Sequence, residues 1–101
     1  MTLFRLWKAR VNSVVLPFSP YFPWRNVDTL QQKFGKMIRA RRLKLGLGQE
    51  SLADKASIHR THVSLLERGK RMPSLEVIRK LASALETTMA SLMKELEAMD
   101  G

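Results

Sequence analysis

Apolar side chains follow a helical period through most of the chain. From Asp28 onward they recur every three or four residues, the spacing that places them on one face of a helix. Five such segments are separated by short polar stretches, at residues 28–45, 49–56, 59–68, 74–85 and 88–96. No segment alternates between apolar and polar residues as a strand would, and no internal repeat is visible. The pattern therefore predicts an all-α, five-helix domain with short connections.

The ends of these segments carry capping residues. Asp28 is placed to cap the first helix, with Gln31 as its capping-box partner. Gly46 is placed to end that helix in the left-handed conformation. Ser74 and Thr88 are expected to cap the fourth and fifth helices, because their hydroxyl groups accept from free backbone N–H groups.

The predicted core is formed by one face of each helix. In the first helix this face has five apolar positions out of six. The inward positions are Leu30, Phe34, Met37, Ile38, Arg41 and Leu45, then Leu52, Ala53 and Ala56, then Val63 and Leu66, then Leu75, Ile78, Leu81, Ala82 and Leu85.

Residues 1–27 differ from the rest and are predicted to form an N-terminal extension, partly helical, ahead of a domain at 28–101. Apolar residues from Leu3 to Val14 have helical spacing, and the prolines from Pro17 to Pro23 forbid a continuous helix after them. The segment is too short and charged to span a membrane, and no signal-peptide cleavage site follows it. Its role is open between a DNA-backbone arm, a dimer contact, a membrane-surface helix and an idle product of an early translation start. Its composition also resembles an organelle-targeting sequence, but the rest of the chain argues against that role.

The charge is strongly basic and unevenly distributed. Eighteen Lys and Arg residues stand against nine Asp and Glu, giving a net charge of +9. Such a field attracts polyanions, nucleic acid first and anionic membranes second. Residues 1–27 and 33–44 contain no acidic residue, whereas the tail from Glu86 onward is acidic. This asymmetry suits a protein that presents one face to DNA and another to a partner.

Several classes of site find no support in the sequence. The chain has no cysteine, which excludes disulfides, thiolate zinc sites and cysteine nucleophiles and fits a cytoplasmic protein. His59 and His62 lie three residues apart, but no third ligand accompanies them, so we expect neither metal nor cofactor. There is no recognisable nucleophile–base pair and no glycine-rich phosphate loop, so we do not expect an enzyme.

The segment from Gln49 to Glu67 is the most informative. Two helices joined by a turn of three or four residues must cross steeply. The small Ala53 lets the third helix approach, and Ile58 fills the space under the turn. The outward face of the third helix carries mainly polar residues, which suits the polar, acidic groove of DNA. These residues are Arg60, Thr61, Ser64, Leu65 and Arg68.

This segment resembles the helix-turn-helix of the Cro/phage-repressor-like regulators, also called the xenobiotic-response-element family. The resemblance runs from about Phe34 to Met93. It is carried by Gln49-Glu50-Ser51-Leu52-Ala53, Val63-Ser64, Leu66-Glu67-Arg68-Gly69-Lys70, Pro73-Ser74-Leu75 and Leu81-Ala82-Ser83-Ala84-Leu85. The stretch from His59 to Ser64 is also similar to the recognition helix of restriction–modification controller proteins. The resemblance implies a lambda-repressor-like fold with its recognition helix at about residues 59–68.

The resemblance and the charge pattern together suggest DNA-binding roles for particular residues. Arg60 is expected to bind guanine through two hydrogen bonds, and Leu65 either meets a thymine methyl group or packs within the protein. The expected base-reading residues are Arg60, Thr61, Ser64 and Leu65, and the expected backbone contacts are Gln49, Lys36, Arg39, His62, Lys70 and Arg71. The alternative for each backbone contact is a solvated side chain.

Two further assignments concern the scaffold. The resemblance implies an ion pair between Arg42 and Glu67 that joins the first and third helices. It also implies a homodimer through the last helices, because two modules related by a two-fold axis read half-sites ~34 Å apart. The expected dimer interface is Met89, Leu92, Met93 and Leu96, for which core packing is the alternative.

The chain departs from the family at three positions. Ser57 stands where a turn glycine is usual, and a left-handed serine costs roughly 1 kcal/mol, so an altered turn is expected. His59 stands where Ser, Thr or Asp is usual, so the start of the third helix is expected to fray. Glu86 stands where a glycine usually precedes the fifth helix.

Sequence-specific binding of double-stranded DNA by a dimeric transcriptional repressor or activator is the main functional prediction. A protein-interaction module, such as an antitoxin or a restriction–modification controller subunit, is the alternative. In that case the acidic tail and the aromatic N-terminal segment would be the contact surfaces.

Overall fold

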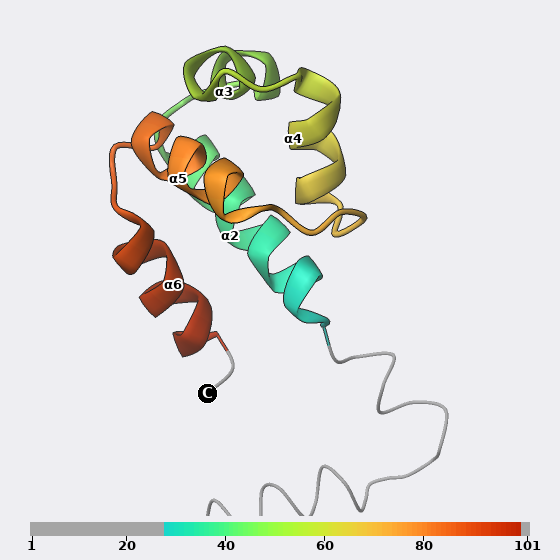
Figure 1. Ribbon diagram of the computed structural model, residues 1–101, viewed down its shortest axis with the longest axis vertical. Coiled ribbons are helices and arrows are strands. Elements are labelled where there is room, and N and C mark those ends of the chain that lie inside the picture. The colour runs from blue at the N-terminus through green and yellow to red at the C-terminus, as the bar shows by residue number, and fades with distance from the viewer. Residues whose placement is uncertain (1–27, 100–101) are drawn as a thin grey trace, which may run out of the picture.

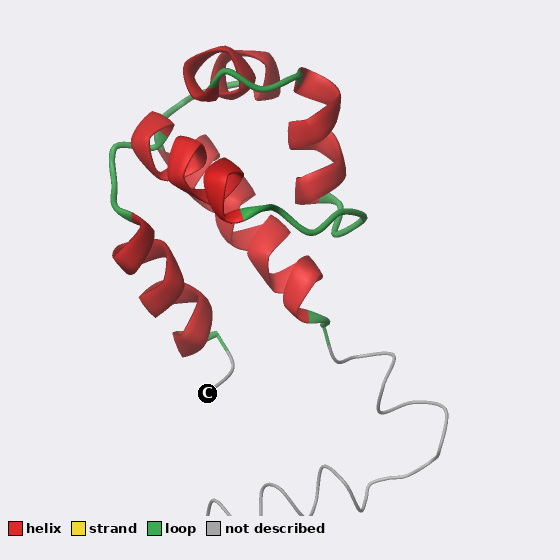
Figure 2. Ribbon diagram, viewed as in Figure 1, coloured by secondary structure: helices red, strands yellow, loops and turns green. Residues whose placement is uncertain are grey.

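The computed structural model describes residues 28–99, and this part of the chain is built from α-helices joined by short loops (Figures 1 and 2). The helices are α2 (Leu30–Lys44), α3 (Gln49–Ala56), α4 (Arg60–Glu67), α5 (Leu75–Ala84) and α6 (Met89–Ala98). No strand occurs within residues 28–99. The predicted all-α, five-helix architecture is therefore confirmed. The predicted N-terminal extension at 1–27 lies outside the described residues.

The helices enclose a single core. Helix α2 packs against α4 and α6, α3 packs against α4 and α5, and α5 packs against α6. In Figure 1, α3 and α4 meet at the top of the molecule, α5 crosses in front of α2, and α6 extends down beside them. The largest fully buried side chains are Met37, Ile38, Leu52, Val63, Leu66, Leu81 and Leu92. Every helix thus contributes to the core, which fixes the orientation of α3 and α4.

The N-terminus of α2 is capped one residue later than predicted. The Thr29 hydroxyl oxygen accepts from the Gln32 N–H at 3.1 Å, and the Gln32 side-chain oxygen accepts from the Thr29 N–H at 2.8 Å. This is a complete capping box, so the prediction for Asp28 and Gln31 was wrong. The Asp28 carboxylate instead accepts from Lys36 Nζ at 2.6 Å.

The predicted apolar faces need correction at their ends. Leu30 is 51% exposed, Leu45 39% and Leu75 74%, because each lies at a helix end beyond the reach of the core. On α2 the buried arginine is Arg42 rather than Arg41. The remaining predicted inward residues are buried, and Ile58 packs against the core as expected.

The turns keep a left-handed backbone with or without glycine. Gly46 has φ of 72°, as predicted for the end of α2, and Gly69 has φ of 70°. Ser57 also adopts this conformation, with φ 57° and ψ 43°, and Glu86 has φ 61°. The expected change in the α3–α4 turn is therefore absent: the Ile58 N–H still closes the turn on the Ala53 carbonyl at 3.0 Å.

Within residues 28–99, no helix is long and apolar enough to cross a membrane.

Candidate nucleic-acid interface

Helix α4 is set against α2 by a backbone contact at Gly35. A Cβ atom at this position would lie 2.3 Å from the Leu66 carbonyl oxygen and 2.7 Å from that of Glu67. Real Cβ atoms do not approach so closely, so only glycine allows this crossing. Sequence reasoning missed this residue, although an isolated glycine inside a helical pattern was a signal for close approach. The contact sets the distance between α4 and α2.

The outer face of α4 is accessible where the helix begins. Arg60 and Thr61 are exposed in its first turn, whereas Ser64 and Leu65 are half-buried. Arg68, the C-cap residue, is exposed, and its Nε donates to the Ser64 carbonyl at 3.4 Å. Of the four expected base-reading residues, Arg60 and Thr61 thus have the greatest freedom to reach a ligand.

His59 caps α4 with its imidazole ring. Its Nδ1 accepts from the Thr61 N–H at 3.0 Å, so this nitrogen carries no proton and Nε2 is the remaining donor. The helix consequently runs over Arg60–Glu67, with His59 as its N-cap, rather than over residues 59–68. The expectation that this end frays was wrong, because the ring nitrogen supplies the acceptor that a serine or aspartate usually supplies.

The expected backbone-contact residues lie on α2, α3, α4 and the loop between α4 and α5. Lys36 and Arg39 are exposed on α2, and Lys36 pairs with Asp28. Lys70 and Arg71 are exposed in the loop between α4 and α5. His62 is half-buried on α4, where burial, together with the positive charge of Arg71, lowers its pKa. A neutral His62 is therefore favoured in the free protein.

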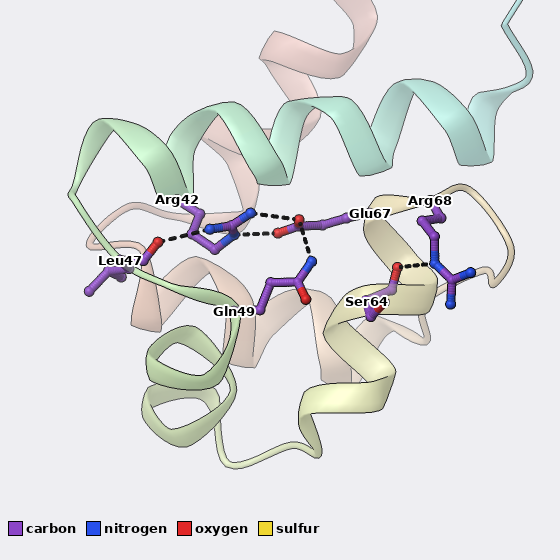
Figure 3. A network of polar contacts seen from close by, with 6 residues as sticks. All are labelled: Arg42, Leu47, Gln49, Ser64, Glu67 and Arg68. Carbon is purple, nitrogen blue, oxygen red and sulfur yellow. Dashed lines mark hydrogen bonds and ion pairs between the residues drawn. The ribbon is translucent and has the colours of Figure 1, made fainter.

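A buried polar network joins α2, α3 and α4 (Figure 3). Arg42 donates from Nε to Glu67 Oε2 at 2.6 Å and from Nη2 to Oε1 at 2.9 Å, so the Arg42–Glu67 ion pair is present. Arg42 Nη1 also donates to the Leu47 carbonyl at 2.8 Å, and Gln49 Nε2 donates to Glu67 Oε1 at 3.0 Å. The Arg42 and Glu67 side chains are only 8% and 3% exposed.

Hydrogen bonding to Glu67 raises the pKa of the Arg42 guanidinium and outweighs its burial, which acts in the opposite direction. A buried pair of this kind fixes orientation more than it adds stability. Here the Glu67 carboxylate receives hydrogen bonds from two different helices, and Gln49 is the member that the sequence reasoning did not connect to it.

The assignment of α6 residues to a dimer interface needs correction. Leu92 is fully buried and Leu96 is 8% exposed, so both belong to the core of the single chain. Met89 and Met93 are half-buried and pack against this core. An ion pair between Arg41 Nε and Glu95 Oε1 at 2.8 Å further ties α6 to α2. Leu92 therefore presents no surface to a partner, and Leu96 presents very little.

Residues 28–99 contain no group of three or more His, Cys, Asp or Glu side chains that could hold a metal ion.

Two short helices crossing at a tight turn, with the second presenting a polar outer face, define a helix-turn-helix module. The chain belongs to the helix-turn-helix family, whose model matches residues 38–92. It is therefore a DNA-binding regulator of the Cro/phage-repressor-like, or xenobiotic-response-element, kind, as the resemblance implied.

Three known proteins illustrate the relationship. Control protein C.MunI from Mycoplasma sp is 33% identical over 72 residues, which cover 70% of this chain and 97% of that protein. The crystal structure of the restriction–modification controller protein C.AhdI from Aeromonas hydrophila has a TM-score of 0.60 and 42% identity, covering 61% of this chain and 94% of that one. The structure of C.Esp1396I bound to a 25 base pair operator site has a TM-score of 0.65 and 28% identity, covering 71% and 95%.

Proposed function

We propose that this protein binds a specific operator in double-stranded DNA as a homodimer and controls transcription, in the manner of a restriction–modification controller. Helix α4 enters the major groove, with Arg60 and Thr61 as its leading base contacts. The observation that carries this proposal is the exposed, polar first turn of α4, held by a backbone contact and a buried ion pair to α2. The structure of C.Esp1396I bound to a 25 base pair operator site supports operator binding by this chain.

The phosphate contacts are assigned to residues around this helix. Lys70 and Arg71 follow α4, Arg39 lies on α2, and the Gln49 amide lies at the start of α3. Such contacts position the protein on the duplex without reading sequence. Ser64 and Leu65, being half-buried, are assigned to the edge of the base-reading surface.

The dimer is proposed because one module of this size reads few base pairs. Two copies related by a two-fold axis would place their α4 helices in successive major grooves, about 34 Å apart. On α6 the half-buried Met89 and Met93 are the remaining candidates for the interface.

Fluorescence anisotropy with a selected operator and a random-sequence pool tests the proposal at several salt concentrations. We expect the operator to bind at least ~10³-fold more tightly than the pool at physiological salt. Arg60→Ala should weaken operator binding by ~1–3 kcal/mol and relax the preference at one base pair. Arg79→Ala, which removes the same charge from α5, is the matched control. Equal binding to all DNA, unaffected by Arg60→Ala, would refute sequence-specific recognition.

A further inference from the structure

The Gln49 side chain is held by the protein before any ligand arrives. Its Nε2 donates to Glu67 Oε1 at 3.0 Å, and only the amide nitrogen can serve there, because a carboxylate oxygen only accepts. One of the two amide protons is thus engaged, and the other remains available for a second acceptor. The orientation of the amide group is fixed by the protein itself.

Glu67 is in turn fixed by Arg42. The guanidinium group donates to both carboxylate oxygens, at 2.6 and 2.9 Å, and the carboxylate is 3% exposed. A bidentate pair in a buried place leaves the carboxylate one orientation. Figure 3 shows the consequence: Arg42 from α2, Glu67 from the end of α4 and Gln49 from the first turn of α3 meet at one point.

We propose that Glu67 is a positioning residue for DNA binding, which orients the Gln49 amide so that its second N–H points to a phosphate oxygen of the bound duplex. This inference rests on the proposed function and adds to it. Glu67 does not touch the DNA. It aligns a donor on α3 with the recognition helix to which Glu67 itself belongs, so both helices approach the duplex in one fixed register.

The alternative is that Glu67 only holds the fold together through Arg42. The two roles differ in how its substitution combines with loss of Gln49. If Glu67 acts through Gln49, removing Gln49 should abolish most of the effect of Glu67→Gln on DNA affinity, because contacting residues are non-additive. If Glu67 acts only through the scaffold, the two effects should add.

The experiment is a double-mutant cycle on operator affinity with Glu67→Gln, Gln49→Ala and the double variant, each checked for folding by circular dichroism. We expect each single variant to bind the operator about ten- to a hundredfold more weakly, as for one lost hydrogen bond to a charged group. The double variant should be little weaker than either single variant. Lys70→Ala is the control partner, and its effect should add to that of Glu67→Gln.

The salt dependence separates the contacts further. The salt slope is the slope of the logarithm of the binding constant against the logarithm of the salt concentration. Gln49 is uncharged and releases no counterion, so Gln49→Ala should leave this slope unchanged. Lys70→Ala should reduce its magnitude by about one. Additive effects of Glu67→Gln and Gln49→Ala would overturn the inference while leaving the proposed function standing. Failure of the wild type to distinguish operator from pool would remove the proposed function and the inference with it.

If Glu67→Gln does not fold, the wild-type protein decides the question by NMR of the Gln49 side-chain amide, assigned with Gln49→Ala. We expect the amide proton bound to Glu67 to resonate away from the position of a solvated glutamine in the free protein, and only the other amide proton to move when operator is added. Two signals at the positions of a solvated glutamine, or two that move together, would overturn the inference.

Discussion

Gly35 on α2 lies against the carbonyl oxygen of Leu66 on α4 so closely that a Cβ atom would stand 2.3 Å from it. The two helices therefore meet backbone to backbone, and the position of the recognition helix does not depend on side-chain packing alone.

Gly35→Ala should destabilise the protein. Alanine favours the helical state by about 1 kcal/mol, but overpacking at a rigid backbone contact costs about 1–3 kcal/mol or more, so a net loss is expected. Thermal unfolding measures it. Gly48→Ala is the control for steric overlap, because nothing lies within 4 Å of a Cβ there; any loss it shows, up to about 1 kcal/mol, reports the N-cap of α3, which glycine suits better than alanine. An unchanged melting temperature for Gly35→Ala would show that α2 and α4 separate without penalty.

The two left-handed positions that lack glycine should gain stability from it. Ser57→Gly and Glu86→Gly each remove up to ~1 kcal/mol of backbone strain, partly offset by the greater freedom of glycine in the unfolded chain. Melting temperatures should therefore rise by a few degrees. Gly46→Ala is the converse control: its Cβ meets no neighbour, so any loss reports the left-handed backbone alone.

His62 should make stability depend on pH. Its pKa in the folded protein is below the ordinary value of about 6.5, because burial and Arg71 disfavour the imidazolium. The unfolded chain thus binds the proton more readily. The stabilising contribution of the neutral ring is complete above pH ~6.5 and declines as the pH falls through the folded pKa. Urea unfolding of wild type and His62→Gln between pH 8 and 5 measures it, and parallel curves would contradict the prediction.

DNA binding should raise the pKa of His62, which burial in the free protein lowers. A phosphate near His62 favours the imidazolium, so binding should take up a proton and affinity should increase as the pH falls toward 6. The comparison of wild type with His62→Gln isolates this group from His59. A pH-independent affinity ratio between the two proteins would place His62 away from the DNA backbone.

The imidazole cap of α4 can be replaced by a stronger one. His59→Ser should keep the hydrogen bond to the backbone N–H at the start of α4 and stabilise the protein slightly, whereas His59→Ala should cost about 0.5–2 kcal/mol. Chemical denaturation of the two variants gives the difference. If His59→Ala were as stable as the wild type, the ring nitrogen would contribute nothing to the helix start.

Leu92 should behave as a core residue. Leu92→Ala is expected to cost about 2–5 kcal/mol, because the side chain is fully buried within the single chain. Met93→Ala, at a half-buried position, should cost less in stability and have the larger effect on association measured by light scattering. The reverse order would restore the interface assignment of Leu92.

The sequence predicted what depends on neighbours along the chain. The helical period, the caps at Ser74 and Thr88, and the left-handed Gly46 are all local features, and the structure contains them. The first cap was assigned to Asp28 and missed the local signal of a capping box, a threonine followed three residues later by a glutamine, at Thr29 and Gln32. Leu75 was misplaced because periodicity does not reveal where a helix projects past the core.

The connections between helices could not be read from the sequence in the same way. Glu67 receives hydrogen bonds from residues 25 and 18 positions away, and the resemblance supplied only the first of these partners. The contact of Gly35 with Leu66 likewise depends on how two helices cross, which no periodicity expresses. His59 was judged by the usual preference for small caps, which overlooks the acceptor on an imidazole ring.

The backbone contact at Gly35 holds α4 in place independently of the side chains on its outer face. Because glycine and main-chain oxygens hold the helix from below, its solvent-facing side chains take no part in keeping it in place. If Arg60 and Thr61 read the operator as proposed, they can be exchanged as operators diverge, with no compensating change inside the domain. A lineage carrying this scaffold could acquire new binding sites by single substitutions on one helical turn.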